Sequence, residues 1–488
     1  MPERWTYALL FVLLLPACFI GLRTTHDWGD DFAQYLSQAH DLCEGRAIDP
    51  AEAVVNWADY GPAPKGLGFS FLLLPIQLLR GNEVLPYLVL NALVLVGVGL
   101  LLFRYLQWDF GPWPALLGVL LFAYDRHVLH AKSEIMPDLL FALVVLGSCC
   151  VLRGARTTRW SWIAVLAACA VLVKSGGWVL YATMALVAIR EFRKTPEVRR
   201  ITMADLLTLL LLPLMSAAGF TGLLSSVWSS DASWYGGVIG FHVSPATLMS
   251  NTAAYAASFV HFFEQELPLW MNRLLVPLVL LSIVAGVVRR ARRGADAGDV
   301  FVALWMLLLL CYPYTNATDR FLLPVLPFAL RYLLEGMHWV IGAVRLPLPT
   351  FMIVVPALFL ATSVLTVLGA VRSGELPVVG PYSNDAQEAL GMIARMTPTD
   401  ALVGSARPWA VHLFTGRTTV WLPTPGEPMS RALRTPLPVP DLALLATSAA
   451  HKGMYDAPLL RAIMNDTLWS PIWRNDSFTL VQRKQTKR

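Results

Sequence analysis

Apolar stretches long enough to cross a lipid bilayer recur along the whole sequence, and short breaks rich in basic residues or in proline and glycine separate them. A bilayer core of about 30 Å takes roughly 20 apolar residues of helix. Of the 488 residues, 56% are hydrophobic and 15% are charged, a composition that excludes an ordinary soluble enzyme. The sequence therefore predicts an all-α polytopic membrane bundle of about 10 to 12 helical segments.

Three of the breaks are strongly basic, namely 153–159, 190–200 and 289–293. Lys and Arg concentrate in cytoplasmic loops, so we expect all three on the cytoplasmic side. The net charge of +5 then reflects membrane topology, and we expect no nucleic-acid partner. Alternation of the segments across the membrane places four stretches on the outer side: 23–66, 125–138, 225–273 and the chain after about 372.

The composition changes after Leu368, and this change predicts two domains. Residues 1–371 form the membrane domain, and residues 372–488 form a small α/β domain on the extracytoplasmic side. In this second part 384–396 reads as an amphipathic helix and 401–405 as a strand. Residues 67–79 contain Pro75 and are too few for a comfortable crossing of the bilayer, so we expect this run to be partly inserted or paired with a neighbouring break. The short loops favour a location of the protein in the plasma (inner) membrane of a bacterium.

An acidic cluster follows the first apolar stretch, where Asp27, Asp30 and Asp31 fall within five positions. Asp31 suits the N-cap of the helical pattern that follows. The functional alternative is that a carboxylate at the outer rim of the membrane serves as a general base or metal ligand.

A second acidic group lies at 125–138, just before another apolar stretch. An acid at the mouth of a membrane helix is costly against lipid, so Asp138 should face the protein interior or water, or cap the helix. His127, His130 and Glu134 follow a spacing that would put them on one helix face with ligand types suited to a metal. We expect these histidines to face solvent instead of holding a zinc ion.

Three cations belong to the predicted outer side: Lys65, Lys174 and Arg320. Basic residues at helix ends commonly extend to the membrane interface. Cytoplasmic anchoring does not require cations on the outer side, whereas an anionic lipid phosphate would be held by them. The usual sequence signals of ATP hydrolysis, dinucleotide binding, serine hydrolysis and zincin chemistry are absent.

In this order the motifs resemble those of the GT-C superfamily of polyprenyl-phosphate-sugar-dependent glycosyltransferases, in the branch of protein O-mannosyltransferases and bacterial aminoarabinose transferases of lipid A. Asp30-Asp31 resembles the family's catalytic loop, and 64–67 resembles its K-P-P-L signature with Gly66 in place of a proline. Residues 133–138 look like its second loop, 174–176 like its lysine-glycine break, and 320–327 like its R-Y-L-L-P-x-x-P pattern.

The resemblance implies an inverting transfer of a sugar from a polyprenyl phosphate to a hydroxyl of a lipid, glycan or protein acceptor in the outer leaflet. It implies Asp31 as the base, with Asp30 supporting or replacing it. Lys65, Arg320 and Lys174 would hold the donor phosphate. Asp138 and Glu134 would hold the acceptor or a divalent metal ion, the one candidate cofactor.

The main alternative is a transporter or flippase that binds an anionic lipid-linked substrate without chemistry. Such a protein would place ionisable residues near the membrane midplane and often contains inverted repeats. Here the acids cluster at one rim, and we find no internal repeat. A non-catalytic partner subunit is a third possibility, which predicts an apolar outer patch. The glycosyltransferase interpretation requires Asp31, Lys65, Asp138 and Arg320 to surround one pocket.

Overall fold

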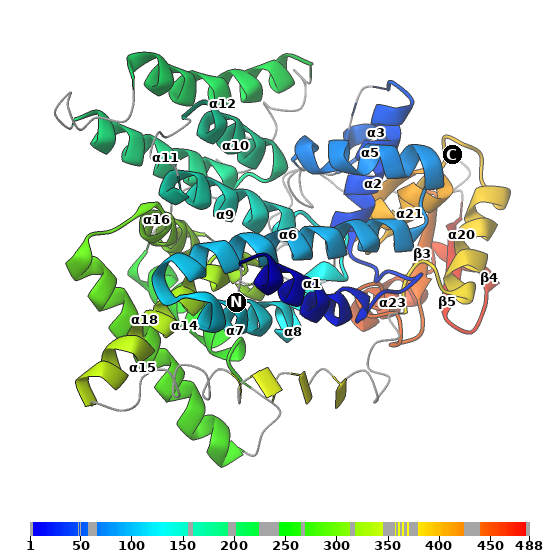
Figure 1. Ribbon diagram of the computed structural model, residues 1–488. Helices are drawn as coiled ribbons and strands as arrows, with labels where there is room; N and C mark the ends of the chain where they lie inside the picture. Colours follow the sequence, from blue (N-terminus) through cyan, green and yellow to red (C-terminus); the bar gives the residue numbers. More distant parts are fainter. Residues whose placement is uncertain are drawn as a thin grey trace. The chain divides into compact units, whose positions relative to one another are not determined.

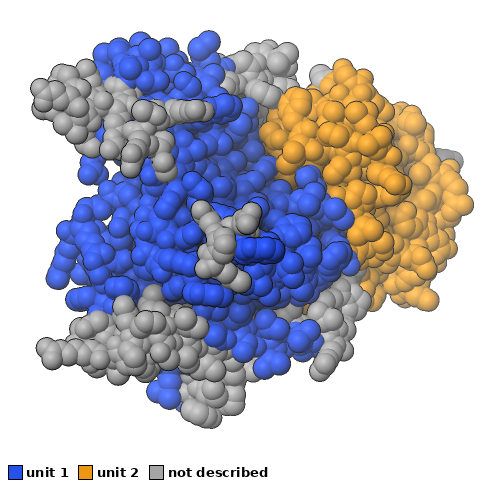
Figure 2. All heavy atoms as spheres, in the orientation of Figure 1, with its two compact units in different colours: residues 1–22, 88–220, 239–376 blue, residues 23–87, 221–238, 377–488 orange. Residues whose placement is uncertain are grey.

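The computed structural model divides the chain into two compact units, coloured separately in Figure 2. Unit 1 comprises residues 1–22, 88–220 and 239–376, and unit 2 comprises 23–87, 221–238 and 377–488. The structure describes residues 3–46, 48, 50–56, 66–154, 160–193, 202–223, 244–264, 269–312, 318–344, 357, 360–361, 364–365, 368–369, 379–423 and 440–484. Lys65 lies outside the described residues, so its predicted phosphate role stays a prediction.

Unit 1 is helical, and its core is a large cluster of buried aliphatic and aromatic side chains. Most of its helices are labelled in Figure 1. They are α1 (Glu3–Phe19), α6 (Val84–Phe110, whose first turn belongs to unit 2), α7 (Pro112–Ala123), α8 (Arg126–Lys132), α9 (Asp138–Gly154), α10 (Trp160–Val173), α11 (Gly177–Phe192), α12 (Met203–Leu223, whose last residues belong to unit 2), α14 (Pro245–His261), α15 (Leu269–Arg293), α16 (Ala297–Cys311), α17 (Thr318–Leu322) and α18 (Leu326–Val344). Among them α9 packs on α10, α10 on α11, and α15 along α18. The predicted helical architecture is confirmed.

The predicted polytopic membrane topology, and with it the number of crossings, stays a prediction. Within the described ranges, two helices are long and apolar enough to span a bilayer, Val84–Phe110 and Asn272–Arg293. Several others are apolar but shorter: Trp5–Phe19, Leu67–Arg80, Pro112–Ala123, Trp160–Val173, Met203–Met215 and Ala297–Cys311.

Close packing at the break between α10 and α11 requires glycine at two positions. A Cβ atom on Gly177 would lie 2.2 Å from the backbone carbonyl of Ala170, and one on Gly176 would lie 2.5 Å from the Trp305 ring. Only glycine fits at this distance from a backbone and a buried indole. The tight break fixes the position of Lys174, which lies immediately before it.

Unit 2 is built around a small mixed sheet. Its strands are β1 (Leu402–Ser405), β2 (Thr418–Trp421), β3 (Leu442–Ala446), β4 (Trp469–Arg474) and β5 (Phe478–Arg483), in the order β2-β1-β3-β5-β4. The first two pairings are parallel and the last two are antiparallel. Its helices are α2 (Asp30–Cys43), α3 (Pro50–Ala53), α5 (Leu67–Arg80), α20 (Asn384–Met396), α21 (Pro408–Thr415) and α23 (Ala457–Asn465). The small C-terminal sheet expected within 372–488 is present. The predicted division at residue 371 stays a prediction.

The segment that follows α1 packs within unit 2, against elements from the end of the chain. Val54 forms a parallel bridge with Thr419. The side chain of Asn56 donates to the Trp421 carbonyl at 3.1 Å and accepts from the Trp421 N–H at 2.8 Å. The α5 helix, 14 residues long, packs along α2 in the same unit. At a rise of about 1.5 Å per residue it is shorter than a bilayer core.

A buried network of charges joins several helices of unit 1. Arg331, a fully buried residue of α18, donates through Nε to Asp109 at 2.8 Å and through Nη1 to the Tyr105 hydroxyl at 2.7 Å. Its Nη1 also lies 2.8 Å from a carboxylate oxygen of Asp296. Arg153 forms a two-pronged ion pair with the same Asp109.

This network gathers the three basic breaks at one end of unit 1. Arg153 lies in the last turn of α9 and Arg190 in the last turn of α11, where Arg190 donates to the Ala295 carbonyl at 3.0 Å. Arg290, near the end of α15, pairs with Asp296 at 3.0 Å. The three segments were expected on one side of the membrane, and the structure brings their ends together.

Removing the Arg331 guanidinium should leave the carboxylates of Asp109 and Asp296 with less positive charge beside them. We predict that Arg331→Met lowers the free energy of unfolding by about 3–5 kcal/mol, measured by denaturation in detergent micelles. Arg292→Met, at an exposed position of α15, should change it by less than about 0.5 kcal/mol. Equal stability of the two variants would show that the buried network does not hold these helices.

Candidate functional site

Asp138, the first residue of α9, binds two cations from distant parts of the chain. It is 1% exposed. Lys174 Nζ forms an ion pair with Asp138 Oδ1, and Arg320 Nε donates to Oδ2 at 2.6 Å. Lys174 comes from the α10–α11 break and Arg320 from α17. The structure therefore brings together three of the residues predicted from sequence.

The three side chains carry a net positive charge, because two cations share one carboxylate. The lysine ammonium also lies 5.4 Å from the centre of the Phe321 ring and 6.0 Å from that of Phe141. Aromatic faces attract cations and exclude water from one side of them. A partly desolvated site with surplus positive charge favours an anionic ligand.

The neighbouring residues of α17 connect this site to α8. His127 Nδ1 lies 3.4 Å from an oxygen of Asp319, and its ring centre lies 4.6 Å from that of Phe262. Thr318 and Ser258 share a hydrogen bond between their hydroxyl groups. These contacts fix α17, and hence Arg320, against α8 and α14.

The predicted helix face of His127, His130 and Glu134 does not form, because α8 ends at Lys132. His127 pairs with Asp319, whereas His130, 72% exposed at its side chain, lies 4.0 Å from a Glu134 oxygen. The expected arrangement is therefore wrong for Glu134, whereas His127 and His130 both lie on α8. The expectation that both histidines face solvent holds for His130 and fails for His127, which is 17% exposed at its side chain. Their weak metal role stays a prediction. Ser133 ends the helix, and its N–H bonds back to the carbonyls of Leu129 and His130.

Asp138 does not fit a divalent cation in this arrangement. Both of its oxygens face positive groups, Lys174 on one side and Arg320 on the other. A metal ion bound there would be repelled by both. The prediction that Asp138 serves as a metal ligand therefore disagrees with its surroundings. Glu134 is 4% exposed, and its predicted role as an acceptor or metal contact stays a prediction.

The two neighbouring acids Asp30 and Asp31 of unit 2 have different surroundings. The N-cap of α2 is Gly29, so the prediction that Asp31 caps this helix is wrong. Asp30 is 6% exposed, accepts from the Ala410 N–H at 3.1 Å and lies 3.9 Å from Arg407 Nη1. Its carboxylate thus stabilises the first turn of α21. Asp31 is half-buried in the first turn of α2.

Trp28 fixes the segment that leads into α2. Its indole N–H donates to His451 Nδ1 at 3.1 Å, and its ring centre lies 5.8 Å from that of Phe478. Both Trp28 and His451 are 1% exposed. The two acids are therefore presented by a segment that the sheet of unit 2 holds in place.

Lys132 is a structural residue that sequence reasoning missed. It is fully buried and donates to the carbonyls of Cys18, at 3.2 Å, and Ile20, at the end of α1. A lysine there satisfies the last carbonyls of the helix. Its only signal in the sequence was a charge close to apolar segments, which does not identify a partner.

Comparison of the fold with solved structures identifies its type. The crystal structure of ArnT from Cupriavidus metallidurans bound to undecaprenyl phosphate matches with a TM-score of 0.61 and 12% identity, over 100% of this chain and 99% of that one. The chain has the GT-C fold. The apo state of the same ArnT matches with a TM-score of 0.56 and 12% identity, over 97% of each chain.

An oligosaccharyltransferase from Archaeoglobus fulgidus, crystallised with Zn and sulfate, matches with a TM-score of 0.49 and 13% identity, over 83% of this chain and 62% of that one. A scan against protein-family models gives no match, and a search of curated proteins gives no significant one.

Within the GT-C fold of this chain, the Asp138 site and the basic network occupy opposite ends of the same helices. Asp138 begins α9, and Arg153 lies in its last turn, about 22 Å away by the helical rise. Lys174 follows α10 and precedes α11, whereas Arg190 lies in the last turn of α11. The charges of unit 1 are thus divided into two groups with apolar helix between them.

Asp125 is a buried acid at the start of α8, and its pKa can be tested. It caps α8 by accepting from the N–H groups of His127, at 2.8 Å, and Val128, at 3.2 Å. Burial raises the pKa of its carboxyl group from 3.8 to about 7. The folded state therefore favours the protonated acid. The contribution of the protonated Asp125 side chain to the free energy of unfolding is complete below about pH 4 and is lost as the pH rises through 7.

We predict that the wild-type protein loses up to about 4 kcal/mol of unfolding free energy from this group between pH 4 and pH 8. Asp125→Asn keeps a capping side chain and has no such titration, so its stability should fall less over this range. The measurement is thermal unfolding in detergent across the pH range. Parallel curves for the two proteins would contradict the raised pKa.

Proposed function

We propose that this chain is an integral membrane glycosyltransferase that transfers a sugar from a polyprenyl-phosphate donor to an acceptor hydroxyl, with inversion at the anomeric carbon. The observation that carries the proposal is the group of Asp138, Lys174 and Arg320 in a GT-C fold. The proposal places the protein in a bacterial plasma membrane as a multi-pass protein. The reaction and the C-terminal part then lie on the outer side.

Lys174 and Arg320 would hold the donor phosphate. Asp138 contacts one nitrogen of each side chain, and an ammonium and a guanidinium carry three and five N–H donors. One buried carboxylate orients both cations and leaves the group with a net positive charge. A solved structure of similar fold contains undecaprenyl phosphate, which supports this ligand class. Lys65 remains a proposed third cation.

Asp31 would act as the general base. In the step, the acceptor oxygen forms a bond to the anomeric carbon, and the bond from that carbon to the phosphate oxygen breaks. The hydroxyl proton passes to the Asp31 carboxylate, and the polyprenyl phosphate leaves with the electron pair. The cations stabilise this charge more in the transition state than in the ground state. Glu134 is the proposed contact for the acceptor.

Asp30 has a positioning role in this proposal, since its carboxylate accepts a hydrogen bond from the Ala410 N–H. We predict that Asp31→Asn lowers the transfer rate at least a thousandfold while the protein still binds its donor. Asp30→Asn keeps an oxygen acceptor for the same N–H and should retain at least a tenth of the rate. Transfer is measured with radiolabelled polyprenyl-phosphate sugars and a panel of acceptors.

Near wild-type transfer by Asp31→Asn would exclude this residue as the base. Donor binding without transfer by the wild-type protein, for every donor and acceptor of the panel, would favour a flippase or transporter of the same lipid-linked substrate.

Arg320→Gln tests the phosphate site. Loss of one charge-assisted hydrogen bond costs about 1.5–3 kcal/mol, so we predict a rise of about tenfold or more in the donor Kd. Arg273→Gln removes an exposed arginine of α15 and serves as the control. Donor affinity is measured by competition with undecaprenyl phosphate in detergent. An unchanged Kd in Arg320→Gln, or an equal rise in the control, would remove Arg320 from the phosphate site.

A further inference from the structure

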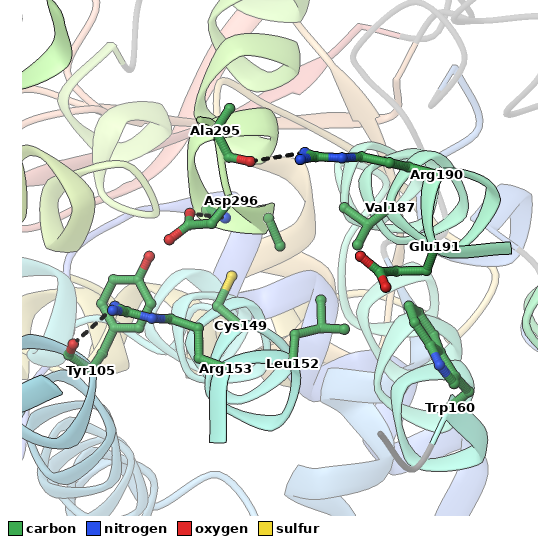
Figure 3. A pocket seen from close by; sticks show the side chains of 12 residues that line it. Tyr105, Cys149, Leu152, Arg153, Trp160, Val187, Arg190, Glu191, Ala295 and Asp296 are labelled. Atoms are coloured by element: carbon green, nitrogen blue, oxygen red, sulfur yellow. Dashed lines mark hydrogen bonds between the residues drawn. The ribbon is translucent and has the colours of Figure 1, made fainter. Parts of the chain in front are cut away.

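Buried polar groups in proteins are nearly always paired, and a cavity at one end of unit 1 shows such pairing. The cavity has a volume of about 290 Å³ and lies between the ends of α9 and α11 and the starts of α10 and α16 (Figure 3). Its lining residue Arg153 is bound to Asp109, and its lining residue Asp296 is bound by Arg290 and Arg331. The protein itself therefore satisfies these charges.

The middle of α2 in unit 2 is different, because three of its buried side chains have polar atoms without a partner. Gln34 and Gln38 are each 2% exposed, and Ser37 is 6% exposed. Within the described ranges, nothing forms a hydrogen bond with Nε2 of Gln34, Nε2 of Gln38 or Oγ of Ser37. A buried polar group without a partner costs free energy, so three of them together require an explanation.

The three side chains share one face of α2. Their spacing of i, i+3 and i+4 places them beside one another on the helix. Asp31, the proposed base, lies three positions before Gln34 on this face, and Asp41 lies three positions after Gln38. Both acids are half-buried, and both are more exposed than the polar residues between them. The face therefore extends about 15 Å along the helix, with a carboxylate at each end.

Gln38 is held by α5 through the other end of its amide group. The Ser70 hydroxyl donates to Gln38 Oε1 at 3.0 Å and lies 3.3 Å from the Tyr35 carbonyl. Because the amide is planar, this contact also fixes the direction of the Nε2 donors. The unpaired donors of Gln38 thus belong to a side chain that α5 holds in place.

We propose that this face of α2 binds the hydroxyl groups of a sugar ring. Its amide groups donate and its serine hydroxyl donates and accepts, and sugar hydroxyls can meet both needs. Positions 31, 34, 37, 38 and 41 hold no cation, so the face does not suit a phosphate. An apolar ligand would leave the same atoms unpaired. The proposal rests on the glycosyltransferase function proposed above, which supplies two sources of a sugar, the donor and a glycan acceptor.

Methionine variants of the two glutamines test the proposal, since methionine is apolar and of similar shape. The full chain in detergent is titrated with undecaprenyl-phosphate hexoses and pentoses against undecaprenyl phosphate, and with maltotriose against a serine-containing peptide. We expect the wild-type protein to bind a sugar-bearing probe at least tenfold more tightly than its sugar-free counterpart. Gln34→Met and Gln38→Met should each reduce this preference at least fivefold. A reduction confined to the lipid-linked probes identifies the donor sugar, and one confined to maltotriose identifies a glycan acceptor.

Thermal unfolding separates a ligand site from a structural contact. Gln34→Met removes a buried unpaired amide, so it should raise the melting temperature of the ligand-free protein while sugar binding weakens. Gln77→Met in α5 is the matched control, because the Gln77 amide is buried and paired at both ends. It donates to Asn82 at 3.2 Å and accepts from Tyr87 at 2.6 Å. This control should lower the melting temperature and leave the preference for sugar unchanged.

Three results would overturn the proposal: equal binding of sugar-bearing and sugar-free probes by the wild-type protein, an unchanged preference in both α2 variants, or an equal loss in Gln77→Met. If a variant does not fold, photo-crosslinking of wild-type protein with diazirine-labelled sugar probes decides, since the label must fall on α2. Transfer is assayed on the same samples. Sugar-dependent binding without any transfer by the wild-type protein would contradict the enzyme proposal and support this one.

Discussion

The ion pairs of Asp138 with Lys174 and Arg320 determine how one end of unit 1 is built. A buried carboxylate at the start of an apolar helix is stable only with compensating charge. Here the compensating positive charge comes from Lys174 and Arg320, which lie 36 and 182 positions away from Asp138 in the sequence. The break between α10 and α11, the short helix α17 and the start of α9 must therefore meet at one point. Two cations around one acid at that point support the anionic donor that we propose.

The same helices separate two kinds of polar chemistry. At one end Lys174 and Arg320 both pair with the buried carboxylate of Asp138. At the other end the paired charges balance, because Arg153, Arg290 and Arg331 are matched by three acids, Asp109, Asp296 and Asp299. The first arrangement suits a site where charge develops during a reaction, and the second suits a structural joint. Apolar packing along α9 to α11 keeps the two apart.

Sequence reasoning identified the residues of the Asp138 site because charges beside long apolar segments are conspicuous. It could not identify their pairing, which depends on how α9, α11 and α17 pack. It could not separate Asp30 from Asp31 either, since the difference is a hydrogen bond to Ala410, far away in the chain. Arg331 was missed because one arginine in an apolar helix gives no indication of three partners. The helix 384–396 was predicted correctly from local periodicity alone.

The central claim is that Lys174 and Arg320 hold the phosphate of a polyprenyl donor. An experimental structure of the protein with undecaprenyl phosphate in a lipid nanodisc tests it most directly. We predict phosphate oxygens within about 3 Å of nitrogen atoms of both side chains, with Asp138 still contacting each of them. A phosphate bound elsewhere, with neither cation touching it, would contradict the claim.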